Sequence, residues 1–314
     1  MARCLSFHAS YRCRSSGACC SAGWRIPFAG DELAEVRQLA LQRGAFVPQS
    51  DGGAAAAVRG DGACTFLEED RLCEIHRLGG QRRLPLTCRM FPRLVLHDAR
   101  GTFVSLSHFC PTAASMLFEP GPPASIVDAP DSLIDVGPLD GLDAREVWPP
   151  LLRPDMLTDL DSYEAWERLA VETLTRDGVP PRESLAALEA ATARIAQWSP
   201  GGVPLLDEVH ATFAALAPPV RVSQATNATN ATDTPDATET AVKRWLAARL
   251  FGCWIAYQGR GLSTIVRYVR ACLDAFALEL ARDGDPLQAI RRCDRLIVHE
   301  ASSQRMATLL DDRS

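Results

Sequence analysis

The sequence predicts a mainly α-helical protein with an irregular, cysteine-rich N-terminal part that contains one short β-hairpin. Three observations predict this fold class. Eight of the eleven cysteines lie within the first 110 residues of the 314-residue chain. A stretch rich in Pro, Gly and Asp follows, which excludes long helices. Beyond it, apolar residues recur three and four positions apart, as they do in amphipathic helices.

These changes of composition divide the chain into five segments. The low-complexity segment is almost free of apolar side chains and is therefore expected to be a flexible linker. The predicted segments are a cysteine-cluster domain over 1–118, a Pro/Gly-rich connector over 119–154, a helical segment over 155–222, the linker over 223–240, and a C-terminal helical segment over 241–314.

Three local elements are expected in the cysteine-rich part. Residues 31–43 show helical spacing, with Asp31 as a cap and Gly44 as a stop. Residues 52–61 are small and featureless, which indicates a loop. Apolar β-formers flank a Gly-containing break in 94–106, and this pattern predicts a hairpin.

Six helices are expected in the rest of the chain, because Ala, Leu and Glu dominate there and the apolar positions fall on one face. They cover 163–176, 182–198, 205–217, 241–258, 262–282 and 286–302.

Composition argues against two kinds of partner. A formal charge of −6 gives the chain no general attraction for nucleic acid. The longest apolar run near the C-terminus, 246–257, is interrupted by Arg249 and is shorter than the ~20 residues of a membrane span. No apolar signal segment is seen at the start of the sequence, so a cytoplasmic location is expected.

The clustered cysteines predict a metal site. In a reducing compartment such clustering favours metal ligation or thiol chemistry over disulfides. Thiolate sulfur is the ligand that iron–sulfur clusters and zinc select, and four thiolates are enough for one site. The spacing lacks the doubled C-x2-C pattern of zinc modules, which favours an iron–sulfur cluster with zinc as the alternative. The candidate ligands are Cys13, Cys19, Cys20, Cys64, Cys73, Cys88 and Cys110.

Four sequence steps carry a resemblance to a known family. They are CC-x3-W-x-I from Cys19, C-x-F-L at Cys64 with L-C-x-I around Cys73, C-R-x-F-P-R from Cys88, and Cys-Pro at Cys110. In this order they resemble the YkgJ-type cysteine-cluster family, a zinc- or iron-chelating domain, and within it the branch similar to flagellin lysine N-methylase. The resemblance implies metal chelation. Extended to the whole branch, it also implies a protein lysine N-methyltransferase that uses S-adenosylmethionine on a protein substrate.

One position departs from the family pattern, because Ser16 stands where many members have a cysteine. Three explanations are open: the Ser16 hydroxyl is a poor ligand, Cys4 substitutes for the missing thiol, or the other seven cysteines suffice. The last is favoured, since four ligands complete a site. The cysteines without motif context are expected in the core, and they are Cys4, Cys253, Cys272 and Cys293.

Other side chains near the cysteines have two interpretations each. His76 and His108 can ligate or tune a metal, although a partly exposed histidine without a role is the simpler expectation. His299 carries no signal. Residues 71–93 hold six arginines, which either offset an anionic centre, bind an anionic ligand or form a solvated face.

Two further classes of function stay open at this stage. A zinc-stabilised, non-enzymatic interaction module is the first, and a thiol redox or metal-delivery protein is the second. Phosphate-binding loops and familiar hydrolase motifs are missing from the sequence. Catalytic residues, substrate and oligomeric state therefore remain unassigned.

Overall fold

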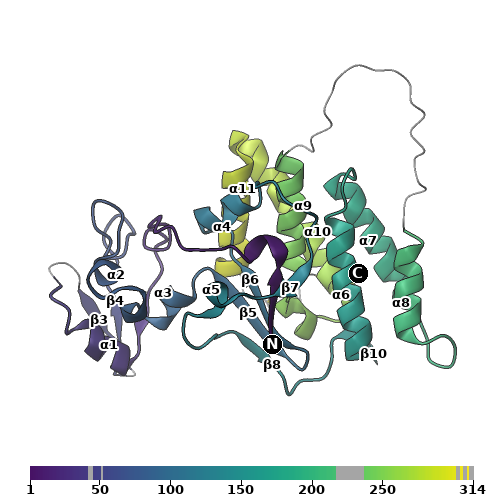
Figure 1. The fold of residues 1–314 in the computed structure, drawn as a ribbon, viewed down its shortest axis with the longest axis horizontal. Helices are drawn as coiled ribbons and strands as arrows, with labels where there is room; N and C mark the ends of the chain where they lie inside the picture. The colour runs from purple at the N-terminus through teal and green to yellow at the C-terminus, as the bar shows by residue number, and fades with distance from the viewer. Residues whose placement is uncertain (42–44, 51, 217–236, 302–304, 307–309, 311–314) are drawn as a thin grey trace.

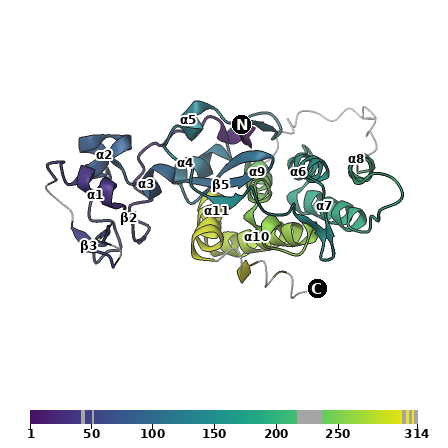
Figure 2. The same cartoon turned by 90° about the horizontal axis from the view of Figure 1, so that it is seen from below.

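The computed structural model describes residues 1–41, 45–50, 52–216, 237–301, 305–306 and 310. Three parts follow one another along the molecule in Figure 1: a small lobe (residues 13–90), a central sheet, and a group of helices from the second half of the chain. The view from below in Figure 2 shows the same order, with the C-terminal helices packed beneath the sheet. The predicted fold class, mainly helical with a short β-hairpin in an irregular N-terminal part, is confirmed, and small sheets are present beyond the hairpin.

The central sheet has five strands and takes them from three distant stretches of the chain. β1 runs parallel to β6 and antiparallel to β7, while β5 runs antiparallel to β6 and parallel to β8. The order across the sheet is β7 (Ile126–Asp128), β1 (Ala2–Leu5), β6 (Gly101–Leu106), β5 (Arg93–Asp98) and β8 (Leu142–Ala144).

β5 and β6 form the predicted hairpin, and their alternating residues separate two hydrophobic cores. Leu96 pairs with Phe103, and both face the large core shared with the C-terminal helices. Val95 pairs with Val104, and both face a second core that contains Cys110. Side chains alternate between the faces of a strand, so this one hairpin holds the helices on one side and the last cysteine segment on the other.

The small lobe is built from very short elements. Its sheet has the order β2 (Pro27–Phe28), β4 (Ala54–Ala56) and β3 (Phe46–Pro48), and its helices are α1 (Gly30–Val36), α2 (Glu74–Gly79), η2 (Gln81–Arg83) and α3 (Leu86–Met90). Its described core contains eight buried apolar residues, of which Ala54 and Ala56 contribute little area. Cys64, Cys73 and Cys88 pack against that core.

Two local predictions for this lobe were wrong. The helix expected over 31–43 begins near the predicted place but ends at Val36, and its N-cap is Ala29 rather than Asp31. Residues 42–44 lie outside the described part of the chain. The loop expected over 52–61 contains β4, because pairing with β2 and β3 on both sides outweighs the weak strand propensity of alanine.

The predicted helices of the second half are present, with shifted ends. The one expected over 241–258 is interrupted at Gly252, whose positive φ of 58° breaks it into α9 and a short 3-10 turn. The linker predicted over 223–240 lies largely outside the described residues. The helices are α6 (Leu160–Leu174), α7 (Pro181–Ile195), α8 (Leu205–Ala214), α9 (Ala237–Leu250), η3 (Trp254–Tyr257), α10 (Leu262–Asp283) and α11 (Pro286–Asp294).

Shorter elements join these parts. α11 continues as one π-helical turn, η4 (Arg295–Glu300), toward the small lobe. The others are η1 (Ser6–His8), α4 (Pro111–Met116), α5 (Asp131–Ile134), β9 (Leu151–Arg153) and β10 (Met156–Leu157). In the described residues, no helix is both long and apolar enough to span a bilayer.

A buried ionic network fastens the hairpin turn to the helices. The guanidinium of Arg100 donates to Asp98 at 2.7 Å and to Glu167 of α6 at 2.9 Å, and all three side chains are at most 2% exposed. Tyr257 donates to Asp98 at 2.7 Å. Glu167 also accepts from the backbone N–H of Gly252 at 3.0 Å. Each charge is therefore paired, which makes its burial tolerable.

We expect the Glu167→Gln substitution to destabilise the protein by about 2 kcal/mol, because it removes the buried ion pair between Arg100 and α6, although Asp98 still neutralises the guanidinium. The matched control is Glu172→Gln on the same helix, whose carboxylate is 49% exposed beside Arg168 and contributes about 0.5 kcal/mol or less. Chemical denaturation followed by circular dichroism measures both. Equal losses in the two variants would contradict the network's role.

Candidate metal centre

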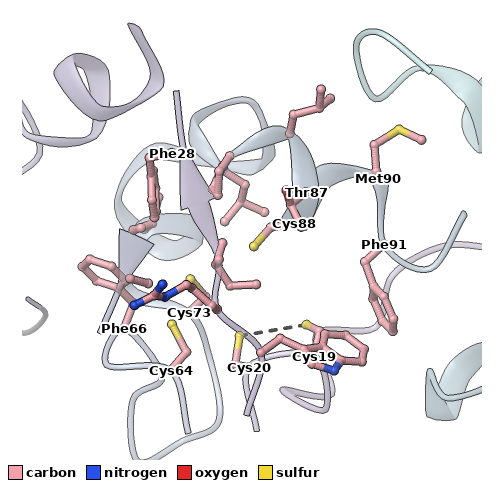
Figure 3. A pocket seen from close by; sticks show the side chains of 18 of the residues that line it. Cys19, Cys20, Phe28, Cys64, Phe66, Cys73, Thr87, Cys88, Met90 and Phe91 are labelled. Atoms are coloured by element: carbon pink, nitrogen blue, oxygen red, sulfur yellow. Dashed lines mark hydrogen bonds between the residues drawn. The ribbon is translucent and has the colours of Figure 1, made fainter. Parts of the chain in front are cut away.

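Five of the seven candidate cysteines line one cavity in the small lobe. This space, called the thiol cavity, has a volume of about 650 Å³. Figure 3 shows their sulfur atoms directed into the same pocket. They come from three stretches of chain far apart in sequence, and they are Cys19, Cys20, Cys64, Cys73 and Cys88.

Short local structures place each thiol. Gly17 has a positive φ of 69°, and a Cβ there would lie 2.8 Å from the carbonyl oxygen of Arg71, so only glycine lets the chain turn toward Cys19 and Cys20. The backbone N–H of Cys64 donates to the carbonyl of Cys20 at 2.6 Å, which joins the first two stretches.

Two more thiols are placed by helices. Cys73 is the residue before α2, and Cys88 lies within α3. A thiol at a helix N-terminus faces backbone N–H groups that favour the thiolate. α2 therefore sets the position of the Cys73 thiol and favours its thiolate, whereas α3 sets the position of Cys88.

Hydrogen bonds link three neighbouring thiols, those of Cys19, Cys20 and Cys73. The Sγ atoms of Cys19 and Cys20 are 3.9 Å apart, and the Cys20 thiol also forms a hydrogen bond with the Cys73 thiol. Hydrogen bonds from Cys20 lower the pKa of Cys19 and lower that of Cys73 to about 7, while the pKa of Cys20 itself is raised by the same bonds. Cys73 is therefore partly ionised near neutral pH, and the same kind of hydrogen bond favours the thiolate of Cys19. Thiolate is the form that binds metal.

The other two thiols of the cavity stay protonated without a metal. Burial raises the pKa of Cys64 and raises that of Cys88 well above the usual value. The charges of Cys19 and Cys73 raise both further. A bound cation would reverse this repulsion and release the protons.

Cys13 and Cys110 do not line the thiol cavity. They line an adjoining space of about 340 Å³, called the basic cavity, whose wall also includes Cys19, Cys20, Cys73 and Cys88. Cys13 is exposed, whereas Cys110 is buried beside the Tyr11 hydroxyl, 3.7 Å from its Sγ. The seven cysteines are thus divided into five that surround the thiol cavity and two that lie beyond it.

The five thiols surround a space and do not meet at one point. Within the described residues, no group of three or more His, Cys, Asp or Glu side chains is arranged so that it could hold a metal ion as it stands. The ligand assignment therefore remains a prediction. Of the alternatives for the missing family cysteine, Ser16 lines only the basic cavity, and Cys4 is fully buried in the second core.

The three other cysteines expected in the core are indeed buried in the large helical core. They are Cys253, Cys272 and Cys293.

His299 also lines the thiol cavity, although no sequence pattern predicted this. η4 carries it to Trp24, at 4.6 Å between ring centroids, and its Nε2 lies 2.7 Å from the Ser107 hydroxyl. Burial lowers the pKa of His299 to about 4, so the ring is neutral at pH 7. Sequence reasoning missed this residue because it lies some 200 residues from the cysteine motifs. No periodicity in the sequence predicts such a contact.

The two histidines beside the cysteine motifs have different surroundings. His76 lines the basic cavity. His108 is fully buried, in contrast to the expected partial exposure: its Nε2 lies 3.1 Å from the Nε2 of His8, and its backbone N–H donates to Asp294. These contacts join the segment before Cys110 to α11.

Comparison with known families assigns this part of the chain. Residues 12–111 match the model of the CxxCxxCC family, whose printed description is "Putative zinc- or iron-chelating domain". This part of the chain is therefore similar to a cysteine-cluster domain. All seven candidate cysteines lie within the matched residues, which confirms the resemblance to the cysteine-cluster family. Neither a curated protein nor a solved structure gives a significant match.

The cysteine-cluster domain has the chemistry of a soft-metal site. Its match supports binding of zinc or iron, and thiolate ligands suit either metal. The donors fit such a metal, because the thiols are grouped, the pKa values of Cys19 and Cys73 are lowered, and the cavity wall is otherwise largely apolar.

We expect alkylation of Cys73 in the metal-free protein to rise with pH through a midpoint near 7, since the thiolate is the reactive form. Cys20→Ala removes the hydrogen bond that favours this thiolate, so the midpoint should move upward by about one unit or more. Peptide mass spectrometry after brief iodoacetamide treatment measures both. Cys253, whose pKa burial raises to about 12, serves as the unreactive internal control. An unchanged midpoint in Cys20→Ala would contradict the proposed effect of the hydrogen bond from Cys20 on the Cys73 thiolate.

Proposed function

We propose that the protein binds an iron–sulfur cluster in the thiol cavity, with four of its five cysteines as ligands. The observation that carries the proposal is that Cys19, Cys20, Cys64, Cys73 and Cys88, from three separate stretches, line a single cavity. Thiolates are the protein ligands of such clusters, and four are sufficient.

Two features favour a cluster over a single zinc ion. A volume of about 650 Å³ exceeds what one ion enclosed by four thiolates needs, because structural zinc sites are closed and tetrahedral. The ligand spacing also differs from the short paired C-x2-4-C spacing of zinc modules. Zinc in the same cavity is the alternative that the experiment below distinguishes.

A metal would also supply stability that the small lobe lacks. Its described core holds eight buried apolar residues, and the thiols of Cys64, Cys73 and Cys88 lie along the edge of that core. Small units with little apolar core commonly depend on a metal or disulfides. Free energy of metal binding becomes free energy of folding in such units.

An enzymatic activity does not form part of this proposal. The family match ends at residue 111 and its description names chelation alone. Methylation of lysine with S-adenosylmethionine stays a hypothesis that rests on the resemblance to the methylase branch.

Anaerobic purification followed by iron, zinc and acid-labile sulfide analysis tests the proposal. We expect a brown protein with about four iron and four sulfide per chain. Because four of the five cysteines are ligands, at least two of the variants Cys64→Ser, Cys73→Ser and Cys88→Ser should lower the iron content at least tenfold. The matched control is Cys13→Ser, which removes an exposed thiol outside the thiol cavity and should retain iron.

Two outcomes would contradict the proposal. A colourless protein with about one zinc per chain would replace the cluster by a single ion. Retention of iron in all three thiol-cavity variants would place the metal elsewhere.

A further inference from the structure

The basic cavity carries positive charge that the metal centre does not account for. Four arginines line it, while none of the described residues that line it is Asp or Glu. This is unusual in a chain whose formal charge is −6. The arginines are Arg12, Arg71, Arg89 and Arg93.

Backbone carbonyls, rather than carboxylates, orient two of these arginines. Arg71 donates from Nε to the carbonyl of Ser16 at 3.3 Å. Arg93 donates to the carbonyl of Leu133, and to that of Arg89 at 3.2 Å. A neutral carbonyl fixes the direction of a guanidinium but leaves its charge uncompensated.

Among the described residues, only one arginine of this cavity lies close to a carboxylate. Arg89 lies 3.4 Å from Glu32, and Arg12 is exposed on the loop before Cys13. Some arginines elsewhere in the chain form close ion pairs, as Arg77 does with Glu68 at 2.6 Å. In the described part of the chain, three of the four arginines of this cavity have no carboxylate partner, and they are Arg12, Arg71 and Arg93.

A fifth arginine adds to the crowding. Burial lowers the pKa of Arg291, and the nearby positive charge of Arg71 lowers it further, against the effect of Cys110. Arg291 comes from α11 and donates to the carbonyl of Phe109 at 3.1 Å. Asp285 offsets part of the charge of Arg291. Like charges held close together cost free energy that a bound anion would return.

The wall also offers neutral donors. The hydroxyls of Ser15, Ser16, Thr112 and Ser132 line the cavity beside the arginines. Guanidinium groups supplemented by hydroxyls are the donors with which proteins hold phosphate and carboxylate. A volume of about 340 Å³ suits a small molecule and is too small for a folded partner.

We propose that the basic cavity binds a small molecule through an oxyanion group, a phosphate or a carboxylate, directly beside the thiol cavity. The two cavities share the wall formed by Cys19, Cys20, Cys73 and Cys88, so the bound anion lies next to the thiols. Only this placement beside a metal rests on the proposed function.

Offsetting the charge of a thiolate centre is the competing role for these arginines. It suits Arg93, which lines both cavities. Arg12 and Arg71 line the basic cavity alone and are solvent-exposed. Solvent screens exposed charges from a buried centre, whereas an anion entering from solvent meets these two arginines first.

Isothermal titration calorimetry on the purified, metal-loaded full chain tests the site, with inorganic phosphate and acetate as separate probes at low ionic strength. We expect one of them to bind, and the probe that binds identifies the oxyanion. The double variant Arg12→Gln/Arg71→Gln should weaken that binding at least tenfold. The matched control is Arg14→Gln, an exposed arginine of the same loop outside the cavity wall, which should stay within twofold of wild type.

Metal content, measured on the same samples, separates the two proposals. Wild-type protein without metal would contradict the proposed function, whereas the calorimetry alone decides on the anion. Absence of heat with both probes, or equal affinity in wild type and double variant, would overturn the anion site. Loss of metal from the double variant without a change in anion affinity would assign the arginines to charge offset instead.

Discussion

The small lobe depends on sulfur atoms from three stretches of chain gathering around one cavity. Its apolar core is small, and its strands are two or three residues long. Such elements gain little free energy from backbone pairing or from burial. A thiolate metal centre at the edge of this core would hold together segments that hydrophobic packing holds only weakly.

The rest of the molecule supplies what the lobe lacks, a rigid frame on one side of the site. The hairpin β5–β6 is paired along its whole length and fixed to α6 by the buried Arg100 network. From this frame, η4 brings His299 against Trp24 at the wall of the thiol cavity. The helical half therefore contributes to the site although the family match ends well before it.

The seven cysteines lie in two adjoining environments, five around the thiol cavity and two in the wall of the basic cavity. The thiol cavity is lined mainly by apolar side chains and suits a soft metal. The basic cavity is rich in guanidinium and hydroxyl groups and suits an oxyanion. Since both share one wall of thiols, an anion bound in the second would experience the charge of a metal in the first.

Sequence patterns predicted the elements that are long or that are bounded by clear turn residues. The hairpin follows from β-formers around Asp98 to Gly101, and α10 follows from its regular apolar spacing over 262–282. β4 was missed because three alanines carry no strand signal, and only its two neighbours make it a strand.

The candidate site shows the same limit of sequence reasoning. Motif spacing identified the cysteines, but it could not separate Cys13 and Cys110 from the other five. His299 was invisible because its contact with Trp24 depends on the tertiary path of α11 and η4, not on any local pattern.

X-ray absorption spectroscopy at the metal edge tests the central claim most directly. The account predicts a first shell of sulfur alone at roughly 2.3 Å, with a second shell from neighbouring iron atoms. A first shell of nitrogen and oxygen would contradict the account, because the metal would then lie outside the thiol cavity.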